Sequence, residues 1–120
     1  MRSQDFSRSR RVADQIGREL ASMIVSELDD PRVQGITVSG VDLSRDLRNA
    51  TVFVTLHADA DVPAAMQALA RASGMLRARL ARRVRLRSVP LLRFEHDTTL
   101  DRVDRIEQLL RAAQDGQKEP

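Results

Sequence analysis

The spacing of apolar residues along this chain changes abruptly at Pro31, and that change restricts the possible folds more than any other feature. Proline cannot continue a helix, and it keeps the preceding residue, Asp30, out of the helical region. After Pro31, residues 36–43 and 50–56 alternate between apolar and polar, which is typical of half-buried β-strands. Before it, apolar residues recur every three or four positions, as on one face of an α-helix. They are Val12, Ile16, Leu20, Met23, Ile24 and Leu28. A long helix followed by a β-hairpin is therefore predicted.

Gly40 interrupts the alternation in the first of these strands. The apolar positions are Ile36 and Val38 before it but Val41 and Leu43 after it, so the parity slips by one residue. A β-bulge inserts one extra residue into a strand, and a glycine inside a strand often marks one. The polar segment that follows supplies a turn, so we predict that the two strands pair as an antiparallel hairpin.

The second half of the chain begins with another helix signal. Asp61 is suited to cap the N-terminus of this helix, and Pro63 to lie in its first turn. Ala72, Ser73 and Gly74 interrupt the helical pattern, which predicts a kink between two helical segments. Ser73 would then cap the second segment, and Gly74 would let the segments approach closely. The backbone amides freed there could hold a phosphate, although the same residues could equally serve only to bend the chain.

A third strand and a last helix complete the predicted secondary structure. The strand begins near Pro90, because proline cannot donate to a sheet, and the helix begins at Thr98 or Thr99. Three strands need a cover, so we predict an α+β sandwich of order α-β-β-α-kink-α-β-α, with the helices packed on one face of a three-stranded sheet. The length suits one domain with disordered ends. We place the domain at 8–112 and the disordered ends at 1–7 and 113–120.

Positive charge is concentrated in one third of the chain. The net charge is only +3, yet residues 62–94 contain eight arginines and no acidic residue. Like charges three or four residues apart destabilise a helix, and a merely solvated face would usually include glutamates. This segregation indicates a polyanionic partner, nucleic acid before a membrane surface. The alternative is a solvated or internally paired face, for which the acidic segment 95–107 could supply carboxylates.

The arginines after Gly74 are the predicted phosphate-binding residues, because a guanidinium fork suits phosphate. On a helical wheel, three apolar residues of this segment form a buried stripe and three arginines form a contiguous outward face beside it. The stripe is Leu76, Leu80 and Val84, and the face is Arg79, Arg82 and Arg83. The predicted RNA contacts are Arg77, Arg79, Arg82, Arg83, Arg85 and Arg87, with Ser73 and Gly74 at the kink and an auxiliary patch of Arg8, Arg10 and Arg11.

Aromatic residues are too few to suggest recognition by base stacking. The chain has three phenylalanines and no tyrosine or tryptophan. Phe53 and Phe94 lie on predicted strands, where we expect them to be part of the core. Recognition of structured RNA through its shape and phosphate backbone is therefore favoured over readout of stacked single-stranded bases.

Signals for catalysis, a metal or a membrane span are weak. The chain has no cysteine, and it has neither a phosphate-binding glycine-rich loop nor a nucleophile motif. His57, Asp59 and Asp61 have a spacing faintly like that of metal ligands, but Asp61 is already assigned to the helix cap. No apolar run approaches the roughly 20 residues of a membrane span. We expect a soluble, intracellular protein that is not an enzyme and has no cofactor and no bound metal.

Four stretches of the chain carry a resemblance to a known family. They are "RVADQIGRELASMI", "DPRVQGITVSGVDLSRDLRNATVFV", "ASGMLRARLARRVRLRSVPLLRFEHDTTLD" and "RIEQLL". In this order, over about residues 8–110, the chain resembles the bacterial ribosome-binding factor A family. The resemblance implies a type II KH-like fold in which the usual GxxG loop is replaced by an Ala-x-Gly kink, here Ala72, Ser73 and Gly74.

The resemblance also implies a function. It implies a cytoplasmic, non-catalytic assembly factor that binds the maturing small (30S) ribosomal subunit near the 5′ helix of its 16S rRNA. Such factors support late rRNA maturation, notably in the cold, and are released with the help of a partner GTPase. We expect a monomer. The alternatives are a general module for structured RNA, a protein-interaction module that binds through its acidic segments, and a metal-dependent nuclease, against which the missing acidic cluster argues.

Overall fold

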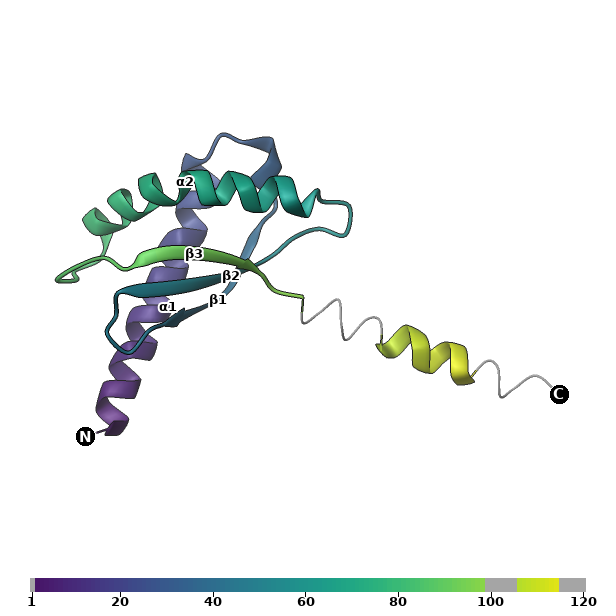
Figure 1. Cartoon of the computed structure of the whole chain (residues 1–120), viewed down its shortest axis with the longest axis horizontal. Helices are drawn as coiled ribbons and strands as arrows, with labels where there is room; N and C mark the ends of the chain where they lie inside the picture. Colours follow the sequence, from purple (N-terminus) through teal and green to yellow (C-terminus); the bar gives the residue numbers. More distant parts are fainter. Residues whose placement is uncertain (1, 99–105, 115–120) are drawn as a thin grey trace.

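The computed structural model describes residues 2–98 and 106–114, with side chains described from residue 8 onward (Figure 1). Two long helices and a three-stranded sheet make up most of the described chain. In chain order the elements are α1 (Arg2–Glu27), a 3-10 turn η1 (Pro31–Val33), β1 (Thr37–Leu43), β2 (Asn49–Thr55), α2 (Val62–Arg83) and β3 (Leu91–His96). Residues 106–114 form a further helix.

The sheet has the order β1-β2-β3, so that β2 is its central strand. β1 pairs with β2 antiparallel, as the predicted hairpin requires, and β3 pairs with β2 parallel. A parallel neighbour needs a crossover connection, and α2 provides it. α1 packs mainly on β1 and α2 mainly on β3. The predicted α+β sandwich, with α1 and α2 on one face of the sheet, is therefore confirmed (Figure 1).

The core lies between the two helices and the inner face of the sheet. Ala50, Val52 and Val54 of β2 are fully buried there, together with Leu20 and Leu69 from the helices. Phe94 packs against this core, as predicted. The prediction for Phe53 is wrong. Phe53 has the opposite parity to Val52 and Val54, so it lies on the outer face of the sheet and is only half-buried.

Several local predictions are confirmed. The register of the hairpin passes from Val38–Val54 to Gly40–Phe53, so the bulge lies where the apolar alternation slips. The carboxylate of Asp61 accepts a hydrogen bond from the Ala64 backbone N–H at 3.1 Å and caps α2. Pro90 is fully buried and directly precedes β3. These signals could be read from the sequence because each depends on residues close along the chain.

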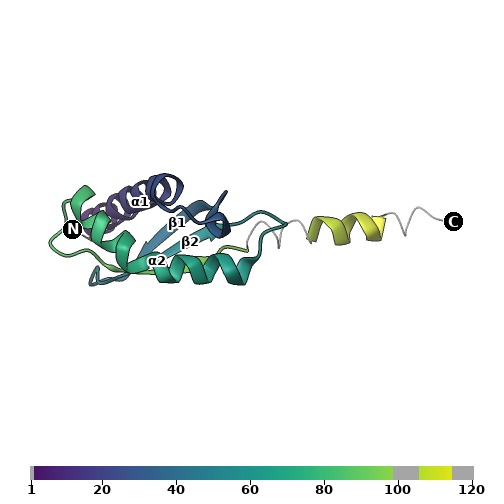
Figure 2. The same cartoon turned by 90° about the horizontal axis from the view of Figure 1, so that it is seen from above.

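The region around Gly74 differs from the prediction of two capped segments. α2 is one hydrogen-bonded helix from Val62 to Arg83, and its axis changes direction along its length (Figure 2). Ser73 is not an N-cap, because its hydroxyl donates to the Ala70 carbonyl at 2.7 Å within the same helix. Such side-chain bonds to the preceding turn bend helices without breaking them. A Cβ at Gly74 would meet nothing within 4 Å, so this glycine does not permit a close approach.

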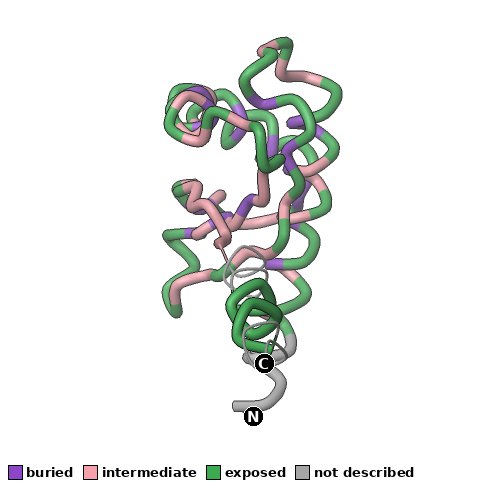
Figure 3. The backbone as a smooth tube through the Cα atoms, turned by 90° about the vertical axis from the view of Figure 1, so that its right-hand side faces the viewer, coloured by how far each residue is buried: buried purple, intermediate pink, exposed green. Residues whose placement is uncertain are grey.

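At both chain ends, described helices extend beyond the predicted domain limits of 8 and 112. α1 begins at Arg2, inside the segment 1–7 for which disorder was expected, because no helix breaker precedes the apolar stripe. Residues 106–114 are helical as predicted, but all of these side chains are exposed (Figure 3). Among the described residues, only α1 and α2 therefore cover the sheet. The predicted helix start at Thr99 and the tail from residue 115 lie outside the described residues.

Candidate nucleic-acid interface

The arginines of α2 are held by the buried side of the same helix. Leu76 and Leu80 are fully inaccessible to solvent and Val84, the C-cap residue, is 4% exposed, so the predicted stripe is confirmed. The Val84 N–H closes the last turn on the Leu80 carbonyl at 3.0 Å. The positions between these anchors must face outward. All six predicted arginines from residue 77 to residue 87 belong to the exposed class.

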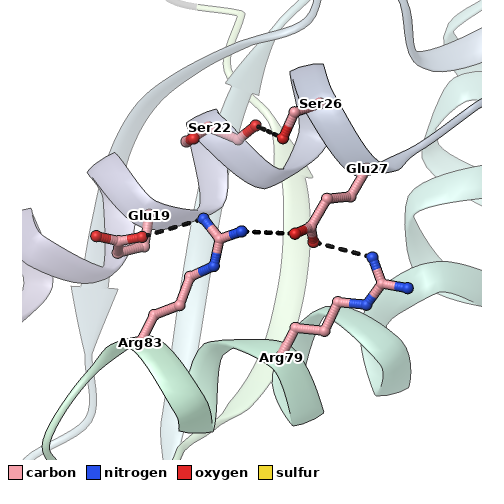
Figure 4. Close-up of polar contacts among 6 residues, drawn as sticks. All are labelled: Glu19, Ser22, Ser26, Glu27, Arg79 and Arg83. Atoms are coloured by element: carbon pink, nitrogen blue, oxygen red, sulfur yellow. Dashed lines mark hydrogen bonds and ion pairs between the residues drawn. The ribbon is translucent and has the colours of Figure 1, made fainter.

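Arg79 and Arg83 converge on acidic residues of α1 (Figure 4). Arg83 Nη2 donates to Glu27 Oε1 at 2.5 Å, and Arg79 Nη1 lies 3.0 Å from Glu27 Oε2. Arg83 Nη1 also reaches Glu19 Oε2 at 3.4 Å. Arg79 and, to a lesser extent, Arg83 hold the pKa of the Glu27 carboxyl below its usual value, although partial desolvation opposes them. Internal pairing therefore applies to these two arginines.

The carboxylates seen in this pairing come from α1, whereas the sequence suggested segment 95–107, of which residues 99–105 lie outside the described residues. Within the described part of that segment, Glu95 pairs only with Arg93, at 3.6 Å. The acidic residues at the end of α1 and just after it also include two with arginine partners. Glu27 binds α2, and Asp30 binds Arg32 through both carboxylate oxygens, which lowers the Asp30 pKa to about 2.

Arg77 is occupied by the chain itself. Its Nε and Nη2 both donate to the Val89 carbonyl, at 3.1 and 2.9 Å. This contact ties α2 to the loop that leads into β3. Arg77 is therefore a residue of the scaffold, and its guanidinium is less available to a ligand than the sequence suggested.

Arg82, Arg85 and Arg87 remain open, and we call them the free arginine cluster. They are exposed, and no described acidic residue pairs with them. They follow one another over the last turn of α2 and the loop to β3, so three cations gather within six residues. Fixed, unneutralised guanidinium groups of this kind bind phosphate oxygens. Three of the six predicted RNA-contacting arginines between residues 77 and 87 therefore have no described acidic partner.

The phosphate site suggested at Ser73 and Gly74 would need free backbone amides. Because α2 is continuous through both residues, the backbone amides there are used inside the helix and are not freed at a helix start. The kink region sets the direction of the helix axis. It provides no helix terminus that could bind a ligand.

Comparison with known proteins assigns the chain to a family. The sequence model described as Ribosome-binding factor A matches residues 8–110. The chain belongs to the ribosome-binding factor A family. The protein named Ribosome-binding factor A from Alkalilimnicola ehrlichii is 51% identical over 108 residues, which cover 88% of this chain and 83% of the relative.

Solved structures of the ribosome-binding factor A family have the same fold. The crystal structure of the Thermus thermophilus protein matches with a TM-score of 0.68 at 39% identity, covering 73% of this chain and 93% of that one. Coordinates of the Thermus thermophilus factor, fitted into a cryo-EM map of a 30S complex, match with a TM-score of 0.63 at 38% identity over 74% and 94% of the two chains. The predicted KH-like fold is confirmed.

The predicted auxiliary patch, Arg8, Arg10 and Arg11, does not lie against α2. These residues are exposed on the first half of α1, whereas α1 contacts the arginines of α2 through Glu19 and Glu27. At least two helical turns separate the patch from that contact. Arg10 instead lines an open groove beside β1 with Asp14, Asp42 and Phe53. Arg87 of the free arginine cluster lines a pocket together with Val12, the residue after Arg11, so the loop end of the cluster lies near the α1 segment that carries the patch.

The remaining sequence candidates have structural environments of their own. Asp61 caps α2, and His57 lies directly against Gly35, whose backbone has a φ of 76°. Residues 8–98 and 106–114 hold no group of three histidine or acidic side chains close enough to bind a metal ion. In the described chain no helix is both long and apolar enough to cross a membrane.

Sequence reasoning missed three residues that shape this interface. Glu19 and Glu27 neutralise part of the arginine face, and nothing in their local sequence indicates a partner 52 to 64 residues away. Arg71 is exposed and has no described acidic partner. It precedes Arg82 by eleven residues, or about three turns, so the helical period could have placed it on the same side of α2.

Proposed function

We propose that this chain is a non-catalytic ribosome assembly factor that binds the maturing 30S subunit, with the free arginine cluster contacting phosphates of 16S rRNA. Membership of the ribosome-binding factor A family supports the proposal, as does the relative whose coordinates were fitted into a 30S complex. The observation that carries it here is the exposed charge of Arg82, Arg85 and Arg87, with which no acidic residue of the described chain pairs. Each guanidinium can donate two parallel hydrogen bonds to a phosphate.

The mechanism requires binding energy only. The last turn of α2, anchored by Leu76 and Leu80, carries Arg82, and the loop that follows carries Arg85 and Arg87, so the fold presents the cluster in one orientation. Phosphates of a folded RNA that match this orientation are bound more tightly than those of other arrangements. A ligand shifts a conformational equilibrium by its difference in affinity for the two states. The factor would therefore favour one rRNA arrangement on the precursor subunit.

The finer proposal follows the family resemblance. It places the protein in the cytoplasm as a monomer, bound near the 5′ helix of 16S rRNA during late processing, with its greatest effect in the cold. A ribosome-associated GTPase would assist its release. None of these steps requires a catalytic residue or a cofactor of this chain.

A second candidate is favoured by one observation. Ile106, Leu109 and Leu110 form an apolar stripe whose side chains are 56–69% exposed. Such a stripe is typical of a protein-binding helix. The protein would then associate through apolar contacts, which depend little on salt, and not through arginines.

Co-sedimentation with purified 30S and 50S subunits over a salt series tests the proposal. We expect the wild type to bind 30S in preference to 50S subunits. The slope of log affinity against log salt concentration should be shallower by about 2 to 3 for Arg82→Ala/Arg85→Ala/Arg87→Ala than for the wild type. The control, Arg18→Ala/Arg45→Ala/Arg48→Ala, removes the same charge from exposed arginines elsewhere. Binding without salt dependence, equal binding to both subunits, or equal effects of the two variants would contradict the proposal.

A further inference from the structure

Arg79 and Arg83 form a two-pronged anion site that is already occupied. They lie one turn apart on α2, and each contacts a different oxygen of the same carboxylate, that of Glu27 (Figure 4). A phosphodiester also offers two non-bridging oxygens to neighbouring guanidinium groups. Glu27 therefore stands where an RNA phosphate would make equivalent contacts.

The position of Glu27 is unfavourable for α1 itself. Glu27 is the last residue of α1, whose last turn contains no basic residue, and acidic side chains oppose the helix dipole at this end. The carboxylate is stabilised from outside its helix, by the arginines of α2. This arrangement makes the contact with α2 the clearest physical reason for an acid at this position.

The contact is also open to exchange. The side chains of Arg79 and Arg83 are 45% and 35% exposed, and that of Glu27 is 21% exposed. Ion pairs at this level of exposure contribute little net stability. Glu27 Oε2 is shielded from solvent and has no hydrogen bond of good geometry, only the charge of Arg79.

We propose that Glu27 is an internal competitor for RNA phosphate at Arg79 and Arg83, and so a specificity-determining residue. This inference rests on the proposed function. In the free protein the carboxylate occupies both guanidinium groups. Arg82 adjoins Arg83, so an RNA bound to the free arginine cluster brings further phosphates beside the pair. A folded RNA with a phosphate at this point displaces Glu27, whereas a flexible polyanion gains too little to do so.

The test compares Glu27→Gln with Asp29→Asn. Both remove one negative charge near the end of α1, but Asp29 is exposed and has no contact with the arginines of α2. The probes are purified 30S subunits and poly-uridylate, with affinities measured over a salt series. We expect Glu27→Gln to bind poly-uridylate about threefold to tenfold more tightly than Asp29→Asn does. The salt dependence should steepen by about 1 to 2, because two more cations become available.

Two further results complete the test. Adding Arg79→Ala and Arg83→Ala to Glu27→Gln should abolish the gain. If Glu27→Gln binds no better than Asp29→Asn while the wild type binds 30S, this inference is overturned and the proposed function stands. Weaker binding by Glu27→Gln also overturns it, because Glu27 would then be a positioning residue for the arginines. If the wild type binds neither probe, both proposals fail.

Discussion

Gly74 lies in the interior of α2, where the structure gives no reason for a glycine. A Cβ there would meet nothing within 4 Å, and the residue does not have a positive φ. Glycine inside a helix costs about 1 kcal/mol relative to alanine, mostly through backbone entropy. We therefore expect Gly74→Ala to raise the free energy of unfolding by about 0.5–1 kcal/mol, as measured by urea denaturation.

Gly35→Ala serves as the contrasting control. Gly35 has a φ of 76°, and a Cβ there would overlap the ring of His57. Left-handed backbone alone costs a residue with a Cβ about 1–2 kcal/mol, so this variant should be clearly destabilised. A loss of stability in Gly74→Ala would show instead that the change of direction in α2 depends on Gly74.

The contact between α1 and α2 should be sensitive to acid. Arg79 first, and Arg83 to a lesser extent, lower the pKa of Glu27 below its ordinary 4.5. A lowered pKa in the folded state means that the stabilisation is complete above pH 4.5 and is lost as the pH falls through the lowered value. We expect the melting temperature of Glu27→Gln to fall less than that of the wild type between pH 5 and pH 3, in a thermal-unfolding series.

Asp30 gives this experiment an internal reference. Its pKa is about 2 because Arg32, two residues away, donates to both of its oxygens. Its contribution is present in both proteins. The difference between the two melting curves isolates Glu27. Parallel curves would contradict the ion pairing seen between α1 and α2.

Among the described residues, the core of the whole molecule ends with β3. The core extends to Phe94, and every described side chain of helix 106–114 is exposed. Apolar groups that stay in water contribute nothing to folding. A variant that ends at Thr98 should therefore keep the free energy of unfolding of the full chain, measured by urea denaturation, to within about 0.5 kcal/mol. A larger loss would mean that residues after Thr98 pack on the sandwich.

The local features of this protein were determined by its sequence alone. The Asp61 cap, the bulge at Gly40 and the entry of β3 at Pro90 each depend on backbone geometry within a few residues. The stripe of Leu76 and Leu80 follows from the helical period in the same way. The alternation of β2 also places Phe53 outside the core, although its apolar side chain suggested a core position.

Tertiary structure alone decided which arginines remain open. On a helical wheel Arg79, Arg82 and Arg83 share one outward face, but α1 crosses that face and divides it. Glu19 and Glu27 neutralise two of the three from positions 52 to 64 residues away, whereas Arg82 pairs with no described acidic residue. An ion pair depends on a separation of a few ångströms in space, and the path of α1 across α2 sets that separation. No pattern within either helix contains this information.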